Sequence, residues 1–131
     1  MKVAFFLGGL NRGGTESLIL DICRNKHLVP FDFVVLYRKE GNYSDAFHAT
    51  DATLIQLPKN SNILQYIVKE QIDIIHSQTP SNSLLCILAK IGLPIKLCTS
   101  FHGLSFRHAN WLQRRLVMRY SDRLVFVSQY T

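Results

Sequence analysis

Residues 2–24 read KVAFFLGGLNRGGTESLILDICR, in which an apolar run, a glycine-rich segment and an amphipathic segment follow one another. The run Val3–Leu7 is continuously apolar, as expected for a strand that helices cover on both faces of a parallel sheet. Residues Glu16–Leu28 carry apolar side chains at helical spacing and predict the first crossover helix. The three pieces together indicate a strand–turn–helix unit of an α/β protein.

The rest of the chain repeats this alternation of strands and helices. Further β-type runs follow Lys2–Leu7 at Asp32–Tyr37, Ala52–Leu57, Asp73–Ser77, Ile95–Ser100 and Arg123–Ser128. Helical patterns follow Ser61 and Thr79-Pro80, the latter over Ser81–Ile91, and span about Phe106–Tyr120. This spacing predicts right-handed crossovers. We therefore expect one α/β domain, a Rossmann-like doubly wound parallel sheet of about six strands in the order 3-2-1-4-5-6, in a three-layer αβα arrangement.

Composition narrows the class of protein. A length of 131 residues with 47% hydrophobic residues suits one domain, and the net charge of +6 favours anionic partners without choosing one. The three cysteines are Cys23, Cys86 and Cys98, and they lie in apolar stretches without metal-ligand spacing. We therefore expect them to be reduced thiols in the core of a cytoplasmic protein, and we expect no metal site. The chain lacks an apolar run of roughly 18 residues, which leaves only peripheral membrane contact.

The glycine-rich segment Gly8–Glu16 is the first candidate site. Ligands of doubly wound sheets bind beyond the carboxyl ends of the strands, and the amides at a helix start can bind phosphate. We expect Gly13 and Gly14 to approach a donor phosphate and Asn11, Arg12 and Glu16 to line the cleft. The segment fits neither GxGxxG nor a P-loop, so dinucleotide and ATP binding are disfavoured. The alternative is a tight turn without a ligand.

Two more polar segments follow the fourth and fifth predicted strands. His76 and Thr79 are candidates for the cleft, although a histidine near a strand end is often structural. His102 and Gly103 follow the fifth strand, where Gly103 lets the chain turn away and leaves His102 at the rim. An imidazole there can hydrogen-bond a sugar hydroxyl or offset charge on a leaving phosphate. We therefore expect His102 to be the catalytic residue.

The region around the last predicted helix is basic. Five arginines crowd the helix and its exit, together with aromatic and apolar side chains, at positions Arg107, Arg114, Arg115, Arg119 and Arg123. Two interpretations stay open: a solvated basic helix, or peripheral docking at the inner face of an anionic membrane. Nucleic acid is not expected as a partner.

Four motifs, taken in this order, resemble the amino-terminal domain of GT-B glycosyltransferases of family 4. They are Gly13-Gly14-Thr15-Glu16, Asp73-Ile74-Ile75-His76-Ser77, Phe101-His102-Gly103 and Ser121-Asp122-Arg123-Leu124-Val125-Phe126-Val127-Ser128. Each motif is weak alone, but their order on successive strand–helix junctions is specific. Gln78 departs from the pattern, since many relatives carry a second histidine there, and the acceptor loop around Gly41–Ala49 is short.

The resemblance implies that residues 1–131 are the acceptor-side domain of a two-domain retaining enzyme. The carboxyl-terminal domain that grips the nucleotide-sugar donor would be missing, and the fragment alone would be inactive. The implied partners are a nucleotide sugar, a sugar or lipid-linked acceptor and the missing domain; no metal or other cofactor is implied. In similar enzymes the glycine loop approaches the donor diphosphate, which carries over to Gly13 and Gly14, and the histidine of the His-Gly pair, His102 here, lies beside the transferred sugar.

Four other functions remain to be weighed. A sugar-nucleotide epimerase of the same architecture would share this half of the molecule, and a non-enzymatic nucleotide-binding module would be complete at this length. A dehydrogenase is disfavoured because the second strand ends in Tyr37-Arg38 rather than in an acidic residue. A glycosidase is disfavoured because no paired carboxylates are expected at the carboxyl ends of the strands.

Overall fold

A computed structural model describes residues 1–58, 63–78, 95–102, 112, 115, 116, 119 and 121–127, with only the backbone described for 100–102 and 124–127. Six strands and three α-helices are assigned there. Their order is β1 (Lys2–Gly9), α1 (Gly14–Arg24), β2 (Asp32–Lys39), α2 (Ser44–His48), β3 (Thr53–Gln56), α3 (Ile63–Lys69), β4 (Ile74–Ser77), β5 (Lys96–His102) and β6 (Arg123–Val127), with a 3-10 turn at Lys26–Leu28 after α1.

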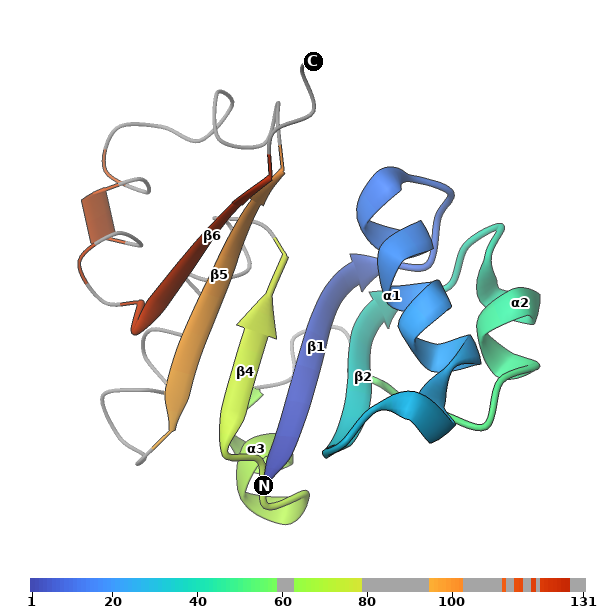
Figure 1. The fold of residues 1–131 in the computed structure, drawn as a ribbon, viewed down its shortest axis with the longest axis horizontal. Helices are drawn as coiled ribbons and strands as arrows, with labels where there is room; N and C mark the ends of the chain where they lie inside the picture. Colours follow the sequence, from blue (N-terminus) through green and yellow to red (C-terminus); the bar gives the residue numbers. More distant parts are fainter. Residues whose placement is uncertain are drawn as a thin grey trace.

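The six strands form one parallel sheet in the order β3-β2-β1-β4-β5-β6 (Figure 1). The sequence order reverses between β1 and β4, because the chain first builds outward to β3 and then starts again on the other side of β1. The expected fold class and strand order are therefore confirmed. In such a sheet the ligand-binding edge lies at the carboxyl ends of the strands beside this reversal.

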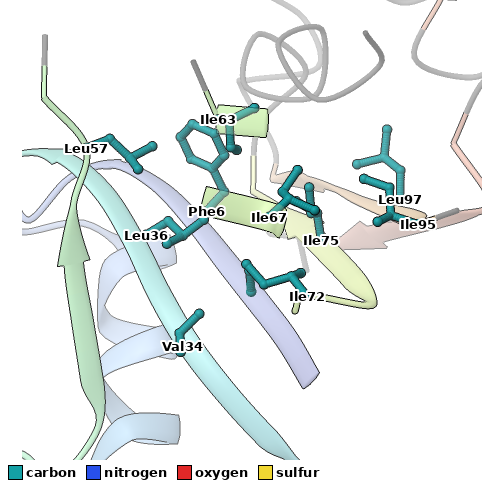
Figure 2. Packing of buried hydrophobic residues seen from close by; sticks show 11 residues of the cluster. Phe6, Val34, Leu36, Leu57, Ile63, Ile67, Ile72, Ile75, Ile95 and Leu97 are labelled. Atoms are coloured by element: carbon teal, nitrogen blue, oxygen red, sulfur yellow. The ribbon is translucent and has the colours of Figure 1, made fainter. Parts of the chain in front are cut away.

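Apolar side chains cover both faces of the sheet, as the continuous run in β1 predicts. Phe6 and Ile75 belong to one core, which is closed by Ile63 and Ile67 of α3 (Figure 2). Alternate β1 residues belong to the other core, under α1 and beside the short α2: Val3, Phe5 and Leu7. Burial of both faces removes apolar surface from water. Each Å² buried contributes about 25 cal/mol to the free energy of folding, and this is the main term that stabilises the layers.

Some helix and strand boundaries differ from the predicted ones, because strand pairing or a local turn determines where the element ends. The first helix ends at Arg24, and a separate 3-10 turn, none of whose residues is buried, carries the chain on to Leu28. Strand β5 runs on to His102 because its pairing with β6 continues to Val127. Helix α2 is not anticipated. The predicted helix Ser81–Ile91 and the cap Ser61 lie outside the described residues, and of Phe106–Tyr120 only four positions are described, all helical.

Within the part of the chain that the structure describes, no helix has the length and apolar content needed to cross a bilayer.

Candidate functional site

The strand register aligns the ends of β1 and β5 at one edge of the sheet. Phe6, Ser77 and Thr99 are register partners across β1, β4 and β5. Gly9 and His102 each follow three residues later on their own strands (9 − 6 and 102 − 99), so their backbones lie at one level. Two strand spacings separate them, on the order of 10 Å. The glycine-rich loop and the His102 backbone therefore flank the end of the shorter β4.

The glycine-rich loop leaves β1 and enters α1 within four residues. Leu10 is fully buried and anchors it, whereas the side chains of Asn11 and Arg12 are exposed at the carboxyl edge. Gly13 caps α1 with an extended backbone (φ −178°, ψ 171°), and its carbonyl accepts the Ser17 amide at 2.9 Å. Any residue can adopt this conformation, so Gly13 is not required for backbone reasons. Gly14 is the first residue of the helix.

The Glu16 side chain folds back over Gly13. A Cβ atom added to Gly13 would lie 2.5 Å from Glu16 Oε2, the far end of a flexible side chain. The carboxylate thus lies at the amino-terminal end of α1, where the helix dipole favours negative charge. An incoming phosphate would meet this carboxylate, which therefore has to move aside when an anion approaches the helix start.

A polar cluster at the end of β2 lies on the same edge. The Tyr37 hydroxyl donates to Glu40 Oε1 at 2.6 Å, and His48 Nε2 lies 3.5 Å from the same oxygen. Hydrogen bonds from Ser44 and Tyr37, and then from His48, lower the pKa of Glu40. Burial, followed by the bond to Glu40, raises the pKa of Tyr37 to about 12. Glu40 is therefore held as an ionised carboxylate with about half of its side chain exposed.

His76 lies apart from this edge. It is the register partner of Phe5, four residues before the level of Gly9, and its ring centroid lies 5.6 Å from that of Phe5 on the α1 face. It lines a cavity of about 620 Å³ on this face, with Cys98 and Arg123 from the neighbouring strands. Gln78, two residues further along the chain, is almost fully buried, and its side-chain amide donates to the His76 carbonyl at 3.3 Å.

The remaining candidate residues are less completely described. For His102 the structure gives the backbone, the last residue of β5 at the carboxyl edge, and Thr79 and Gly103 lie outside the described residues. The structure thus brings Asn11, Arg12, Gly13, Gly14 and Glu16 together on the edge that also ends in His102.

Carboxylates elsewhere bind main-chain amides of the sheet, and the described thiols are free cysteines. Asp73 Oδ2 accepts the Lys2 amide at 2.8 Å, and Asp122 Oδ2 accepts the Leu97 amide at 2.9 Å. Both directly precede a strand, β4 and β6, at the edge of the sheet opposite the carboxyl ends. Burial raises the pKa of Cys23 to about 11 and also raises that of Cys98, so both stay thiols at neutral pH. Among the described residues, no three His, Cys, Asp or Glu side chains gather as metal ligands.

Sequence reasoning missed the contribution of the turn after β2. A Cβ atom added to Gly41 would lie 2.5 Å from the Leu10 carbonyl oxygen, and Asn42 Oδ1 accepts the Arg12 amide at 2.6 Å. The Gly41-Asn42 pair, which begins two residues after the end of β2, is a turn signal in the sequence that could have indicated this contribution.

The chain is similar to known proteins in sequence and in fold. Residues 12–131 match the family model described as Glycosyltransferase Family 4. The putative glycosyltransferase EpsF of Bacillus subtilis is 27% identical over 128 residues, which cover 86% of this chain and 33% of EpsF. The UDP-GlcNAc 2-epimerase of Methanocaldococcus jannaschii shares the fold, with a TM-score of 0.67 and 18% identity over 98% of this chain and 40% of that one. The chain thus spans a third to two fifths of the length of these relatives.

Proposed function

Because the chain belongs to glycosyltransferase family 4, we propose that it forms the amino-terminal, acceptor-side domain of a GT-B enzyme. The parent protein transfers a hexose from a nucleotide sugar to a sugar or a lipid-linked acceptor, in glycan synthesis, with retention of the anomeric configuration and without a metal ion. A carboxyl-terminal domain in the same polypeptide binds the donor. The enzyme works in the cytoplasm, with peripheral contact at the inner face of the membrane.

One observation carries this proposal: the glycine-rich loop and the last residue of β5 meet the same edge of the sheet, beside the reversal of strand order. A separation on the order of 10 Å between their backbones suits a sugar diphosphate that spans the end of β4. No other edge of the sheet combines a helix start with two of the family motifs among the described residues.

The proposed chemistry is positioning and charge stabilisation. The amides of Gly13 and Gly14 and the dipole of α1 face the donor diphosphate, whose leaving phosphate gains negative charge in the transition state. The imidazole of His102 lies beside the transferred sugar. Asn11, Arg12, Glu16, Thr79 and Gly103 form the acceptor side of the cleft, whereas His76, which was also a candidate, lies four residues before this edge and is left out of it.

The test uses the full-length parent protein with UDP-, GDP- and ADP-sugars and candidate acceptors. Acceptor-dependent release of the nucleotide, and an NMR spectrum in which the product keeps the anomeric configuration of the donor, would support the proposal. The 131-residue chain alone should release none. A sugar epimerised without any acceptor would instead favour the epimerase, and nucleotide binding without turnover would favour a binding module.

His102→Ala should lower kcat in the full-length enzyme by roughly 100-fold or more, since preorganised groups at developing charge contribute effects of this size. The far-UV circular dichroism should match the wild type. A variant that keeps wild-type kcat would remove His102 from the reaction while leaving the family assignment intact.

A further inference from the structure

The segment Gly41–Tyr43, between β2 and α2, is held against the glycine-rich loop at each of its three residues. Figure 1 shows the turns after β1 and β2 next to each other at the carboxyl edge. The Tyr43 amide donates to the Leu10 carbonyl at 2.8 Å, and the Arg12 amide donates to Asn42 Oδ1 at 2.6 Å. Gly41 packs so closely on Leu10 and Asn11 that a side chain has no room.

Leu10 is fixed from two directions. Its amide donates to the Lys39 carbonyl at 3.0 Å, its carbonyl accepts the Tyr43 amide, and its side chain is fully buried. The start of the loop is therefore tied to the end of β2 by main-chain bonds, which tolerate substitution of the side chains involved. Asn42 is different, because its side chain supplies the bond.

Asn42 acts on the part of the loop nearest the helix. The Arg12 amide that it binds belongs to the Asn11–Arg12 peptide, one peptide before the one that carries the Gly13 amide, so the bond restrains the chain just ahead of the start of α1. The 2.6 Å separation is slightly below the usual range of about 2.7–3.2 Å for an N–H···O bond.

The segment is braced independently of any ligand. The Gly41 amide donates to Ser44 Oγ at 2.8 Å, and the Ser44 amide donates back to the Gly41 carbonyl at 3.1 Å. On the other side, the Tyr43 hydroxyl lies 3.4 Å from Ser17 Oγ in α1. A braced segment that holds the glycine-rich loop in one conformation lowers the reorganisation of that loop when a ligand binds.

We propose that Asn42 is a positioning residue, whose side-chain carbonyl holds the Arg12 peptide so that the amides of Gly13 and Gly14 are aligned for the donor diphosphate before it binds. This inference rests on the proposed function. It assigns to the turn after β2 a role in donor binding rather than only in acceptor contact.

The test compares Asn42→Ala with Asn42→Asp in the full-length protein, because aspartate keeps an oxygen that accepts the Arg12 amide. Asn25→Ala is the matched control: its exposed amide donates to the Asp21 carbonyl at 2.8 Å, at the far end of α1. Amide exchange followed by NMR should show loss of protection at Arg12 in Asn42→Ala by roughly 3- to 10-fold, the worth of one hydrogen bond. Asn42→Asp and Asn25→Ala should keep it. Unchanged protection in Asn42→Ala would overturn the inference, whether or not the protein is a transferase.

Steady-state kinetics give the second measurement, with whichever of the UDP-, GDP- and ADP-sugars the wild type turns over. Asn42→Ala should raise KM for the nucleotide sugar roughly 3- to 10-fold and leave KM for the acceptor unchanged, and Asn42→Asp should restore the donor KM. Equal changes in both KM values, or none, would overturn the positioning role while the proposed function stands. If the wild-type protein has no transferase activity, both the proposed function and the role of Asn42 in donor binding are wrong. The amide-exchange result would still show whether the Asn42 side chain holds the Arg12 amide.

Discussion

Two glycine-containing turns meet at the carboxyl edge, and they use glycine differently. In the turn after β1, Gly13 has an extended backbone, and an added Cβ would meet only the flexible end of Glu16. In the turn after β2, a Cβ on Gly41 would meet the main chain of Leu10, which cannot move without the buried Leu10 side chain. Packing therefore demands glycine at position 41, whereas at position 13 it does not. Glycine at position 13 is consistent with the proposed approach of the donor diphosphate to the start of α1.

Gly41→Ala should have the largest effect on stability. The added methyl group forces the turn after β2 away from Leu10, and overpacking of this kind costs about 1–3 kcal/mol. The free energy of unfolding, measured by urea denaturation followed by circular dichroism, should fall by that amount.

Gly9→Ala is the matched control for this substitution, since the nearest atoms to an added Cβ lie 3.5 Å away, an ordinary contact. Alanine loses less backbone entropy than glycine on folding, so its stability should stay within about 1 kcal/mol of the wild type. Equal unfolding midpoints for Gly41→Ala and the wild type would show that the two turns separate easily. Packing would then not require glycine at position 41.

Gly13→Ser should separate folding from function. Serine is a favoured residue at the start of a helix, so the free energy of unfolding should change by less than about 1 kcal/mol once Glu16 swings away. In the full-length enzyme, kcat/KM for the donor should nevertheless fall by roughly 10-fold or more, because the new side chain occupies the approach to the α1 amides. Wild-type turnover in this variant would mean that the diphosphate binds elsewhere.

The same contrast explains how far the sequence could predict this molecule. The parallel sheet follows from continuous apolar runs such as Val3–Leu7, which are local. Helix α2 could not be found in this way, because its five residues bury one large apolar side chain, Phe47, and show no period. The fit of Gly41 against Leu10 joins residues 31 positions apart (41 − 10) and depends on the pairing of β1 with β2. The strand topology alone predicted that the glycine-rich loop and His102 share an edge. The position of His76 below that edge could not be predicted, because it depends on the register between β1 and β4.

The smallest expected effect concerns Glu40, which directly precedes Gly41 and joins Tyr37, Ser44 and His48 around the second turn. Hydrogen bonds from Ser44, Tyr37 and His48 lower its pKa below the ordinary value of 4.5. A lowered pKa means that the ionised carboxylate stabilises the fold at pH values above 4.5, and that this contribution is lost as the pH falls through the lowered value. The urea midpoint of the wild type should exceed that of Glu40→Gln at pH 7, and the difference should shrink as the pH falls toward 3.

The difference should also be smaller in a Tyr37→Phe background, where one donor to the carboxylate is missing. A difference that is the same at pH 3 and pH 7 would mean that the charge of Glu40 does not brace the second turn, and that this turn depends on Gly41 and its main-chain bonds alone.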